Sequence, residues 1–324
     1  MSEIIFSIII PFRKPSTYLF ECLEAIKNQS FPNFEVILLP DRKFSLSYPA
    51  KFYQISSTLG PAGKRDLGAR IAKGKFLAFI DDDAFPARDW LKNALSQFAA
   101  ADVAAVCGPG ITPASDNLRQ QAGGWVNSLW LGSGGAGTYR FIPQKRQMVD
   151  DYPSMNFIVR KDDFRHVGGF DTHYWPGEDT KLCFDLVYKS RKVIIYSPLV
   201  LVYHHRRPLF IPHLKQISRY AIHRGYFAKI LPRTSLRLGY LIPSLFVLFL
   251  FTGLLFFQYD TIFIYIYISV VGVYLLLLIV NMAYVMFKTG GIFLALLSGL
   301  GIFMTHLTYG TLFPVGFFKK TLKQ

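Results

Sequence analysis

The chain has 324 residues, of which 51% are hydrophobic and 18% are charged, and it carries a formal charge of +15. This length holds about two domains at ~150 residues each, and so apolar a composition excludes intrinsic disorder. The three cysteines, Cys22, Cys107 and Cys183, show neither a disulfide framework nor metal-ligand spacing, which excludes a disulfide-stapled secreted fold.

The first 200 residues alternate short apolar runs with helical patterns. The patterns predict strands at 4–10, 34–39 and 76–80, and helices at 18–29, from 64 to about 72, and at 87–99. The run 4–10 follows Glu3 without a basic leader, so we interpret it as a buried strand and not as a signal peptide. Such alternation predicts an α/β fold, with a mainly parallel sheet covered by helices on both faces and ligands beyond the strands' carboxyl ends.

Polar residues stand where each of these strands ends. The first strand runs into residues 11–14, the second into Asp41, and the third into Asp81, Asp82 and Asp83. Three adjacent carboxylates repel one another unless a cation is present, and their oxygens suit Mg²⁺ or Mn²⁺. The alternative is a solvated acidic turn that caps the next helix.

Five sequence pieces resemble the family 2 glycosyltransferases, in that family's order and spacing. They are S-I-I-I-P-F-R at 7–13, F-E-V-I-L-L-P-D at 34–41, G-P-A-G-K-R-D-L-G-A at 60–69, F-L-A-F-I-D-D-D-A-F-P at 76–86, and V-G-G-F-D with W-P-G-E-D-T-K-L-C-F-D-L at 167–186. The resemblance spans roughly residues 4–230. It implies the GT-A nucleotide-sugar-binding fold, a catalytic domain over residues 1–204 and inverting sugar transfer.

The resemblance implies a metal site at the end of the third strand. The family's D-x-D element makes Asp83 a metal ligand and Asp81 a contact of both metal and nucleotide, while Asp82 shares either role. A predicted strand at 193–203 leads to two histidines, and His204 is chosen to complete the metal shell; His205 is the alternative.

The resemblance also implies a donor site around the first two strands. The expected donor-binding residues there are Pro11, Arg13 and Asp41, with Asp41 against a uracil ring, although Pro40 replaces one acid of the family's usual pair. Lys64 and Arg65 begin a helix, where cations and free N–H groups favour a phosphate. The alternative is a basic helix start that faces water.

A catalytic base is expected in the second half of the resemblance, because an inverting displacement removes a proton from the acceptor hydroxyl. Glu178 and Asp179 occupy the family's E-D motif, with Asp179 as the base and Glu178 orienting it or the acceptor. Trp175 is expected to stack on a sugar. The alternatives are a helix N-cap for the two acids and a core position for the tryptophan.

Two further segments carry less specific signals. Residues 108–151 are rich in Gly, Pro, Gln and aromatics, and form either a mobile acceptor loop or an ordinary connection. Gln216, Arg219 and Tyr220 resemble the Q-x-x-R-W element of membrane polysaccharide synthases, which contacts the acceptor or the leaving diphosphate; Tyr220 replaces its Trp. A basic amphipathic helix on anionic headgroups is an equal and compatible interpretation.

The last part of the chain is predicted to lie in a membrane. A bilayer core ~30 Å thick needs about 20 apolar residues, and three stretches qualify, at 239–258, 262–287 and 291–313, within a transmembrane domain over 239–324. Basic interfacial helices are expected at 205–238. Residues 186–238 hold eleven Lys and Arg and no acid. By the positive-inside rule, this predicts a multi-pass protein of the plasma (inner) membrane with residues 1–238 in the cytosol.

The last stretch conflicts with that rule. Three spans place Lys319, Lys320 and Lys323 outside, so the stretch is re-entrant, broken near Pro314, or an exception. The basic segment has no nucleic-acid-binding motif beside it, which excludes nucleic acid as a partner.

The sequence therefore predicts a membrane-bound, metal-dependent inverting glycosyltransferase of polysaccharide or glycoconjugate synthesis. Its cofactor is Mg²⁺ or Mn²⁺, its donor a nucleotide-sugar, with UDP favoured over GDP, and its acceptor a lipid-linked or glycan hydroxyl. The first alternative is a polyprenyl-phosphate sugar synthase, whose acceptor needs no base. A more remote one is a membrane transporter or receptor with a nucleotide-sensing domain.

Overall fold

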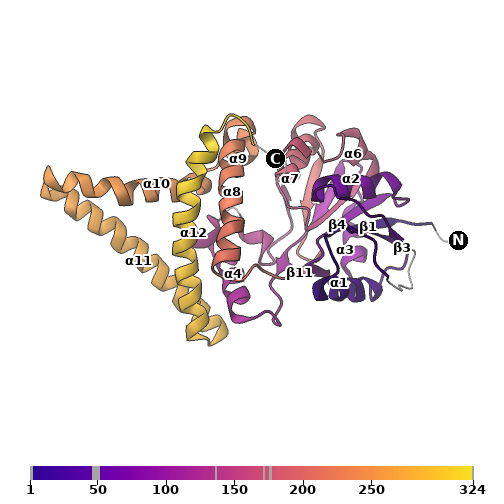
Figure 1. Ribbon diagram of the computed structural model, residues 1–324, viewed down its shortest axis with the longest axis horizontal. Coiled ribbons are helices and arrows are strands. Elements are labelled where there is room, and N and C mark those ends of the chain that lie inside the picture. The colour runs from indigo at the N-terminus through magenta and orange to yellow at the C-terminus, as the bar shows by residue number, and fades with distance from the viewer. Residues whose placement is uncertain (1–2, 46–51, 136, 171, 175–176, 323–324) are drawn as a thin grey trace. The chain divides into compact units, whose positions relative to one another are not determined.

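The computed structural model describes residues 3–45, 52–135, 137–170, 172–174 and 177–322 (Figure 1). The chain forms two compact units. The first consists of Met1–Ile111 and Ile142–His205, and the second of Thr112–Phe141 and Arg206–Lys323. This division differs from the consecutive regions expected at 1–204, 205–238 and 239–324, because residues 112–141 join the second unit.

An eight-stranded sheet forms the centre of the first unit, with its strands in the order β3-β2-β1-β4-β9-β6-β10-β8 (Figure 1). In that order the strands are Phe52–Gln54, Phe34–Leu39, Phe6–Pro11, Phe76–Ile80, Asn156–Arg160, Val103–Cys107, Val193–Tyr196 and Gln147–Val149. β9 and β8 run antiparallel to their neighbours, and the other pairs are parallel. The predicted strands at 4–10, 34–39 and 76–80 are β1, β2 and β4, whose residues are almost all buried.

Helices cover both faces of this sheet. Figure 1 shows α2, α6 and α7 on one face and α1 and α3 on the other. These helices are α1 (Thr17–Lys27), α2 (Pro61–Ile71), α3 (Trp90–Gln97), α6 (Lys161–His166) and α7 (Glu178–Phe184), with short turns at Thr172–Tyr174 and Asp185–Lys189. In α1, Ser16 caps the first turn, and apolar residues at three- and four-residue spacing face the sheet.

A second, three-stranded sheet lies at the carboxyl end of β4. It contains β5 (Ala84–Pro86), β11 (Val202–His204) and β7 (Gly110–Ile111), in the order β5-β11-β7. The single strand predicted at 193–203 is therefore wrong: β10 belongs to the large sheet and β11 to the small one. Pro198 stands between them, and proline cannot donate to a strand ladder.

The second unit is helical. Its helices are α4 (Leu118–Ser128), α5 (Trp130–Ser133), α8 (Ile211–Ile230), α9 (Pro232–Ser235), α10 (Leu238–Thr252), α11 (Thr261–Thr289) and α12 (Ile292–Phe318), with 3₁₀ turns at Thr138–Arg140 and η4 (Gly253–Gln258). Three segments are long and apolar enough to cross a membrane: Leu238–Gln258, Thr261–Thr289 and Ile292–Phe318. α12 continues through Pro314, so this helix is not broken there.

Much of the segment at 108–151, interpreted above as a loop or connection, is helical. Ala122, Val126 and Leu129, in and just after α4, share an apolar core with residues of α11 and α12. Part of this segment thus belongs to the helical core of the second unit.

Candidate functional site

Three metal-ligating side chains meet beyond the carboxyl end of β4. Asp81, Asp83 and His204 each offer a ligand atom, and these atoms lie within 4.8 Å of one another. His204 Nε2 is 3.2 Å from Asp83 Oδ1. Two carboxylates and an imidazole are donors that suit Mn²⁺, and the carboxylates also suit Mg²⁺. Asp82 lies in the same turn, half-buried, outside this group of three.

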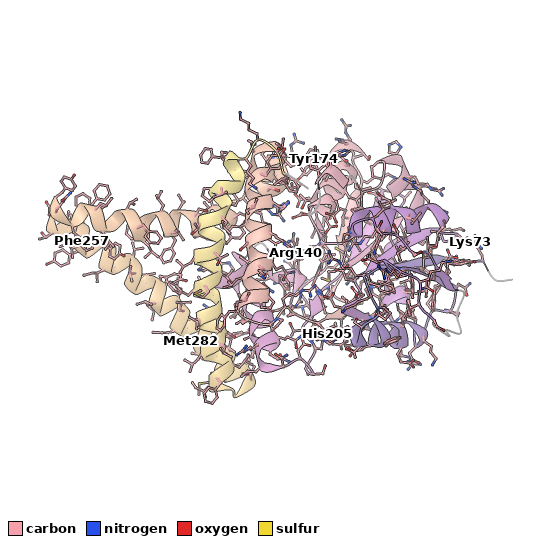
Figure 2. The ribbon with its side chains drawn as sticks, viewed as in Figure 1. Lys73, Arg140, Tyr174, His205, Phe257 and Met282 are labelled. Carbon is pink, nitrogen blue, oxygen red and sulfur yellow. The ribbon has the colours of Figure 1, made fainter. Side chains whose placement is uncertain are left out.

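The pairing of strands in the small sheet determines which histidine faces Asp81 and Asp83. β11 pairs antiparallel with β5, and His204 lies opposite Ala84, next to Asp83. Because side chains alternate along a strand, the next residue turns to the other side: His205 (Figure 2) stacks on Tyr18 at 4.0 Å between ring centroids, and its Nε2 lies 2.7 Å from Glu21. His204, and not His205, therefore joins the two aspartates.

The expected donor residues lie at the ends of β1 and β2. Pro11 ends β1, and the Arg13 carbonyl accepts a hydrogen bond from the Asp41 N–H at 3.1 Å. Lys64 pairs with the Asp41 carboxylate and donates to the Phe12 carbonyl at 2.5 Å. The Lys64 side chain is 3% exposed, which contradicts the interpretation of a helix start that faces water. Lys64 instead ties α2 to both strand ends.

Arg65 connects the metal-ligating group to the carboxyl pair of α7. Its Nη2 atom lies 2.6 Å from Asp81 Oδ1, and its Nη1 atom lies 3.5 Å from Glu178 Oε1. The guanidinium is also 5.8 Å from the Phe170 ring centroid. Burial opposes the charge of Arg65, but Asp81, Asp179 and Glu178 outweigh it and raise the pKa of the guanidinium. One buried cation thus holds carboxylates from two distant parts of the sequence.

Glu178 and Asp179 start α7 with strongly perturbed carboxyls. Burial, and then the charge of Asp179, raise the pKa of Glu178 to about 8. Burial also raises the pKa of Asp179, although Arg65 and hydrogen bonds from the backbone and hydroxyl of Ser154 oppose this. Among the described residues, Glu178 Oε2 and Asp179 Oδ1 are buried without a hydrogen-bond partner. Such oxygens are available to accept a proton.

Two further residues, Ser154 and Asn156, support the candidate site but were not predicted as site residues from the sequence. Ser154 binds Asp179, as described above, and Asn156 ties together the strands around it. The Asn156 amide donates to the carbonyls of Gly108 and Val200 at 2.6 and 2.7 Å, and it accepts from Trp90 Nε1 at 2.8 Å. A Ser-x-Asn sequence has no distinctive pattern, so only long-range contacts show these roles.

Three of the remaining predicted residues belong to the second unit. Gln216, Arg219 and Tyr220 are on α8 in the second unit, where Gln216 Nε2 donates to the Tyr220 hydroxyl at 3.0 Å. Arg219 and Tyr220 are exposed. Trp175 lies outside the described residues.

Comparison with known proteins finds similar glycosyltransferases. The pre-mycofactocin glycosyltransferase of Mycobacterium tuberculosis is 33% identical over 151 residues, which are 46% of this chain and 30% of that protein. Glycosyltransferase AglE of Haloferax volcanii is 25% identical over 193 residues, or 53% of this chain and 58% of that protein. This chain therefore spans less than two thirds of the length of either relative.

A solved structure shares the fold. The mannosyltransferase PcManGT of Pyrobaculum calidifontis, in complex with GDP-Man and Mn²⁺, has a TM-score of 0.51 and 19% identity, covering 70% of this chain and 64% of that one. This likeness confirms the predicted GT-A fold.

The sequence model of one family matches residues 7–168, half of the chain. The match begins in β1 and includes Asp41, the start of α2 and the three aspartates after β4. The chain therefore belongs to Glycosyl transferase family 2.

Proposed function

We propose that the protein is a membrane-bound, metal-dependent inverting glycosyltransferase that moves a sugar from a nucleotide diphosphate to an acceptor hydroxyl. The single observation that carries this proposal is the arrangement around Arg65, which joins the Asp81, Asp83 and His204 group to the buried pair Glu178 and Asp179. Membership of a transferase family favours this enzyme over the transporter or receptor considered above.

The donor is proposed to bind at the carboxyl ends of β1, β2 and β4. Asp81, Asp83 and His204 would hold Mn²⁺ or Mg²⁺, which when bound offsets charge on the leaving diphosphate. Asp41 and Lys64 lie where the base and phosphates are expected. PcManGT, of similar fold, holds GDP-Man and Mn²⁺; for this chain we favour a UDP-sugar because of the resemblance at Asp41, with a GDP-sugar as the alternative.

The two carboxyls of the pair are proposed to differ in protonation, with Glu178 neutral and Asp179 ionised. With a pKa of about 8, Glu178 is mostly protonated at neutral pH. A neutral Glu178 adds no negative charge beside Asp179, which can then remain ionised and accept the proton of the acceptor hydroxyl at its unpartnered Oδ1. Burial raises the pKa of Asp179 and makes its carboxylate a stronger base. Hydrogen bonds from Ser154 hold that carboxylate in place, and the charge of Arg65 favours its ionised form.

The acceptor and location follow from the second unit. Three apolar helices and the basic segment at 186–238 support a multi-pass plasma (inner) membrane protein with a cytosolic catalytic unit. A lipid-linked or glycan acceptor accounts for the presence of a membrane domain. We assign Gln216, Arg219 and Tyr220 to the acceptor or the leaving diphosphate, and Trp175 to the acceptor sugar.

The test is Asp179→Asn in purified protein, with Asp162→Asn, an exposed site on α6, as the matched control. We expect Asp179→Asn to lower transfer by about 10²–10⁴-fold while Mn²⁺-dependent donor binding, followed by thermal shift against UDP- and GDP-sugars, persists. Unchanged transfer in this variant would remove Asp179 from its role. Absence of ion-dependent binding for every nucleotide-sugar would refute the donor site.

A further inference from the structure

The three apolar helical segments of the second unit differ in how much protein covers them. Within the most apolar stretch of each, 11% of the residues of Leu238–Gln258 and of Thr261–Thr289 are buried, against 39% for Ile292–Phe318. The first two are α10 with η4, and α11; the third is α12. α12 is therefore covered by polypeptide over a larger share of its residues than the other two, which present nearly all of their apolar surface outward.

The second half of α12 lies beside α8, a helix that precedes the first apolar segment. His213 Nε2 of α8 is 3.0 Å from the Thr305 hydroxyl. Further along, a Cβ added to Gly225 would lie 2.0 Å from the Phe313 carbonyl oxygen, so the helix backbones touch there. At the end of α8, Lys229 donates a hydrogen bond to the carbonyl of Lys319. The two helices thus run side by side in the same direction.

The composition of α8 excludes the hydrocarbon core as its location. This helix carries four cationic side chains, Lys215, Arg219, Arg224 and Lys229, and each charge at the centre of a bilayer costs several kcal/mol. The second half of α12 lies against α8 along most of the length of α8. This half of α12 therefore lies at the same depth relative to the bilayer as α8.

The first half of α12 lies against another segment that is not a membrane span. Gly301 packs on Val126 of α4 and on Leu209, just before α8. Asn117 begins α4 with a capping box to Gln120, and the first turn contains Arg119 and Gln121 as well. α12 therefore packs on α4 and α8, helices that carry polar and charged residues, and it also touches α10 at Gly310 and α11 at Gly299.

α12 itself has two different sides. The side packed on protein is rich in small and polar residues, such as Gly299, Gly301 and His306, whose ring bonds the Leu131 carbonyl and the Tyr274 hydroxyl, each at 2.9 Å. The large apolar side chains of the other side are exposed: Phe293, Leu296, Leu300, Val315 and Phe318. A helix with one apolar face of this kind lies in the membrane interface, with that face in the acyl chains.

α10–η4 and α11 instead form a hairpin that points away from α12. Figure 1 shows the two helices meeting at a tip and diverging toward different parts of α12; Figure 2 places Phe257 at that tip and Met282 near α12. The 21 and 29 residues of these segments are about 31 and 43 Å long at 1.5 Å per residue. Each length suffices to cross a core ~30 Å thick, the longer one with tilt. Asp260, the one acidic residue after position 238, lies next to the tip.

We propose that only α10–η4 and α11 cross the bilayer, and that α12 lies along its surface on the same side as α4 and α8. Two crossings return the chain to its starting side, so Lys319 and Lys320 join the basic segment at 186–238, in agreement with the positive-inside rule. The surface that binds lipid is then the hairpin together with the exposed apolar face of α12. This inference rests on the membrane anchoring in the proposed function.

The test measures from which side of the membrane each of three introduced cysteines reacts with a membrane-impermeant maleimide. The full chain is used in sealed vesicles. The sites are Lys215→Cys on α8, Tyr259→Cys at the hairpin tip and Lys320→Cys after α12. The natural cysteines are at most 1% exposed, so the unmodified chain serves as the unlabelled background. Labelling after detergent addition checks that each introduced thiol can react.

We expect Lys320→Cys to react from the same side as Lys215→Cys, and Tyr259→Cys only from the other side. Reaction of Lys320→Cys from the side of Tyr259→Cys would overturn the proposal. Release of the protein by an alkaline carbonate wash would instead refute the membrane anchoring itself, whereas sugar transfer by the purified protein tests the enzymatic function separately.

A depth measurement decides the same question if a cysteine variant fails to fold. Fluorophores at Phe293, Leu300 and Phe318, all exposed on α12, are quenched by lipids brominated at known depths. An interfacial helix predicts equal, shallow depths. In a spanning helix, Leu300 would lie about 10 Å from Phe293 along the axis, seven residues at 1.5 Å each, and would be correspondingly deeper, which would overturn the proposal.

Discussion

Replacing Glu178 by Gln tests whether burial or the Arg65 ion pair dominates at the carboxyl pair. The pKa of Glu178 rises from 4.5 to about 8 in the folded protein, first because of burial. The folded state therefore binds this proton more tightly than the unfolded chain does. The stability that the protonated group contributes is complete below about pH 4.5 and is lost as pH rises toward about 8.

The size of the effect follows from that shift. At about 1.4 kcal/mol per unit, burying an ionised Glu178 costs at most about 4 to 5 kcal/mol. Glutamine has nearly the same shape and does not ionise, so Glu178→Gln escapes this loss. We expect the variant and the wild type to have similar melting temperatures at pH 5, and the variant to melt several degrees higher at pH 8.

The assay is thermal unfolding in detergent, followed by intrinsic fluorescence at intervals from pH 5 to pH 8. Glu24→Gln is the matched control, because the Glu24 side chain is 61% exposed on α1, and its difference from the wild type should not change with pH. A Glu178→Gln variant that becomes less stable than the wild type as pH rises would show that the ion pair with Arg65 outweighs burial, and would refute this reasoning.

Three further substitutions test other contacts. Arg65→Met leaves buried carboxylates without their cation, and we expect a loss of about 3–5 kcal/mol in unfolding free energy at pH 7; a loss below about 1 kcal/mol in denaturant titrations would contradict the buried ion pairs. His204→Ala should weaken Mn²⁺ binding at least tenfold, about 1.4 kcal/mol by calorimetry, whereas His205→Ala, whose ring faces α1, should leave the affinity nearly unchanged; equal effects would oppose the assignment. Gly225→Val should lower the melting temperature because its Cβ meets the α12 backbone, while Gly272→Val on α11, with no atom within 4 Å of the added Cβ, should not.

Local patterns in the sequence predicted much of the first unit's sheet. Continuous apolar runs marked β1, β2 and β4, because strands buried on both faces have no polar side. Turn residues after those runs marked the strand ends, and so located Asp41 and the three aspartates at one edge of the sheet. The family pieces added Glu178 and Asp179, which no local pattern distinguishes from an ordinary helix start.

Other features depended on contacts between distant residues. β9 enters the sheet antiparallel between β4 and β6, and β10 and β11 separate into two sheets, because pairing partners are chosen by the whole chain. Arg65 was predicted to bind a phosphate, and that remains a prediction. Its burial between Asp81 and Glu178 could be seen only in the tertiary structure.

The membrane part shows the same division. Length and hydropathy alone identified three apolar segments, since these properties belong to each segment separately. They did not distinguish the exposed α10 and α11 from α12, a larger share of which is covered by protein. That difference arises because α4 and α8 pack on α12. α4 is far from α12 in the sequence, and α8 lies outside the apolar stretches, so only the tertiary structure brings these surfaces together.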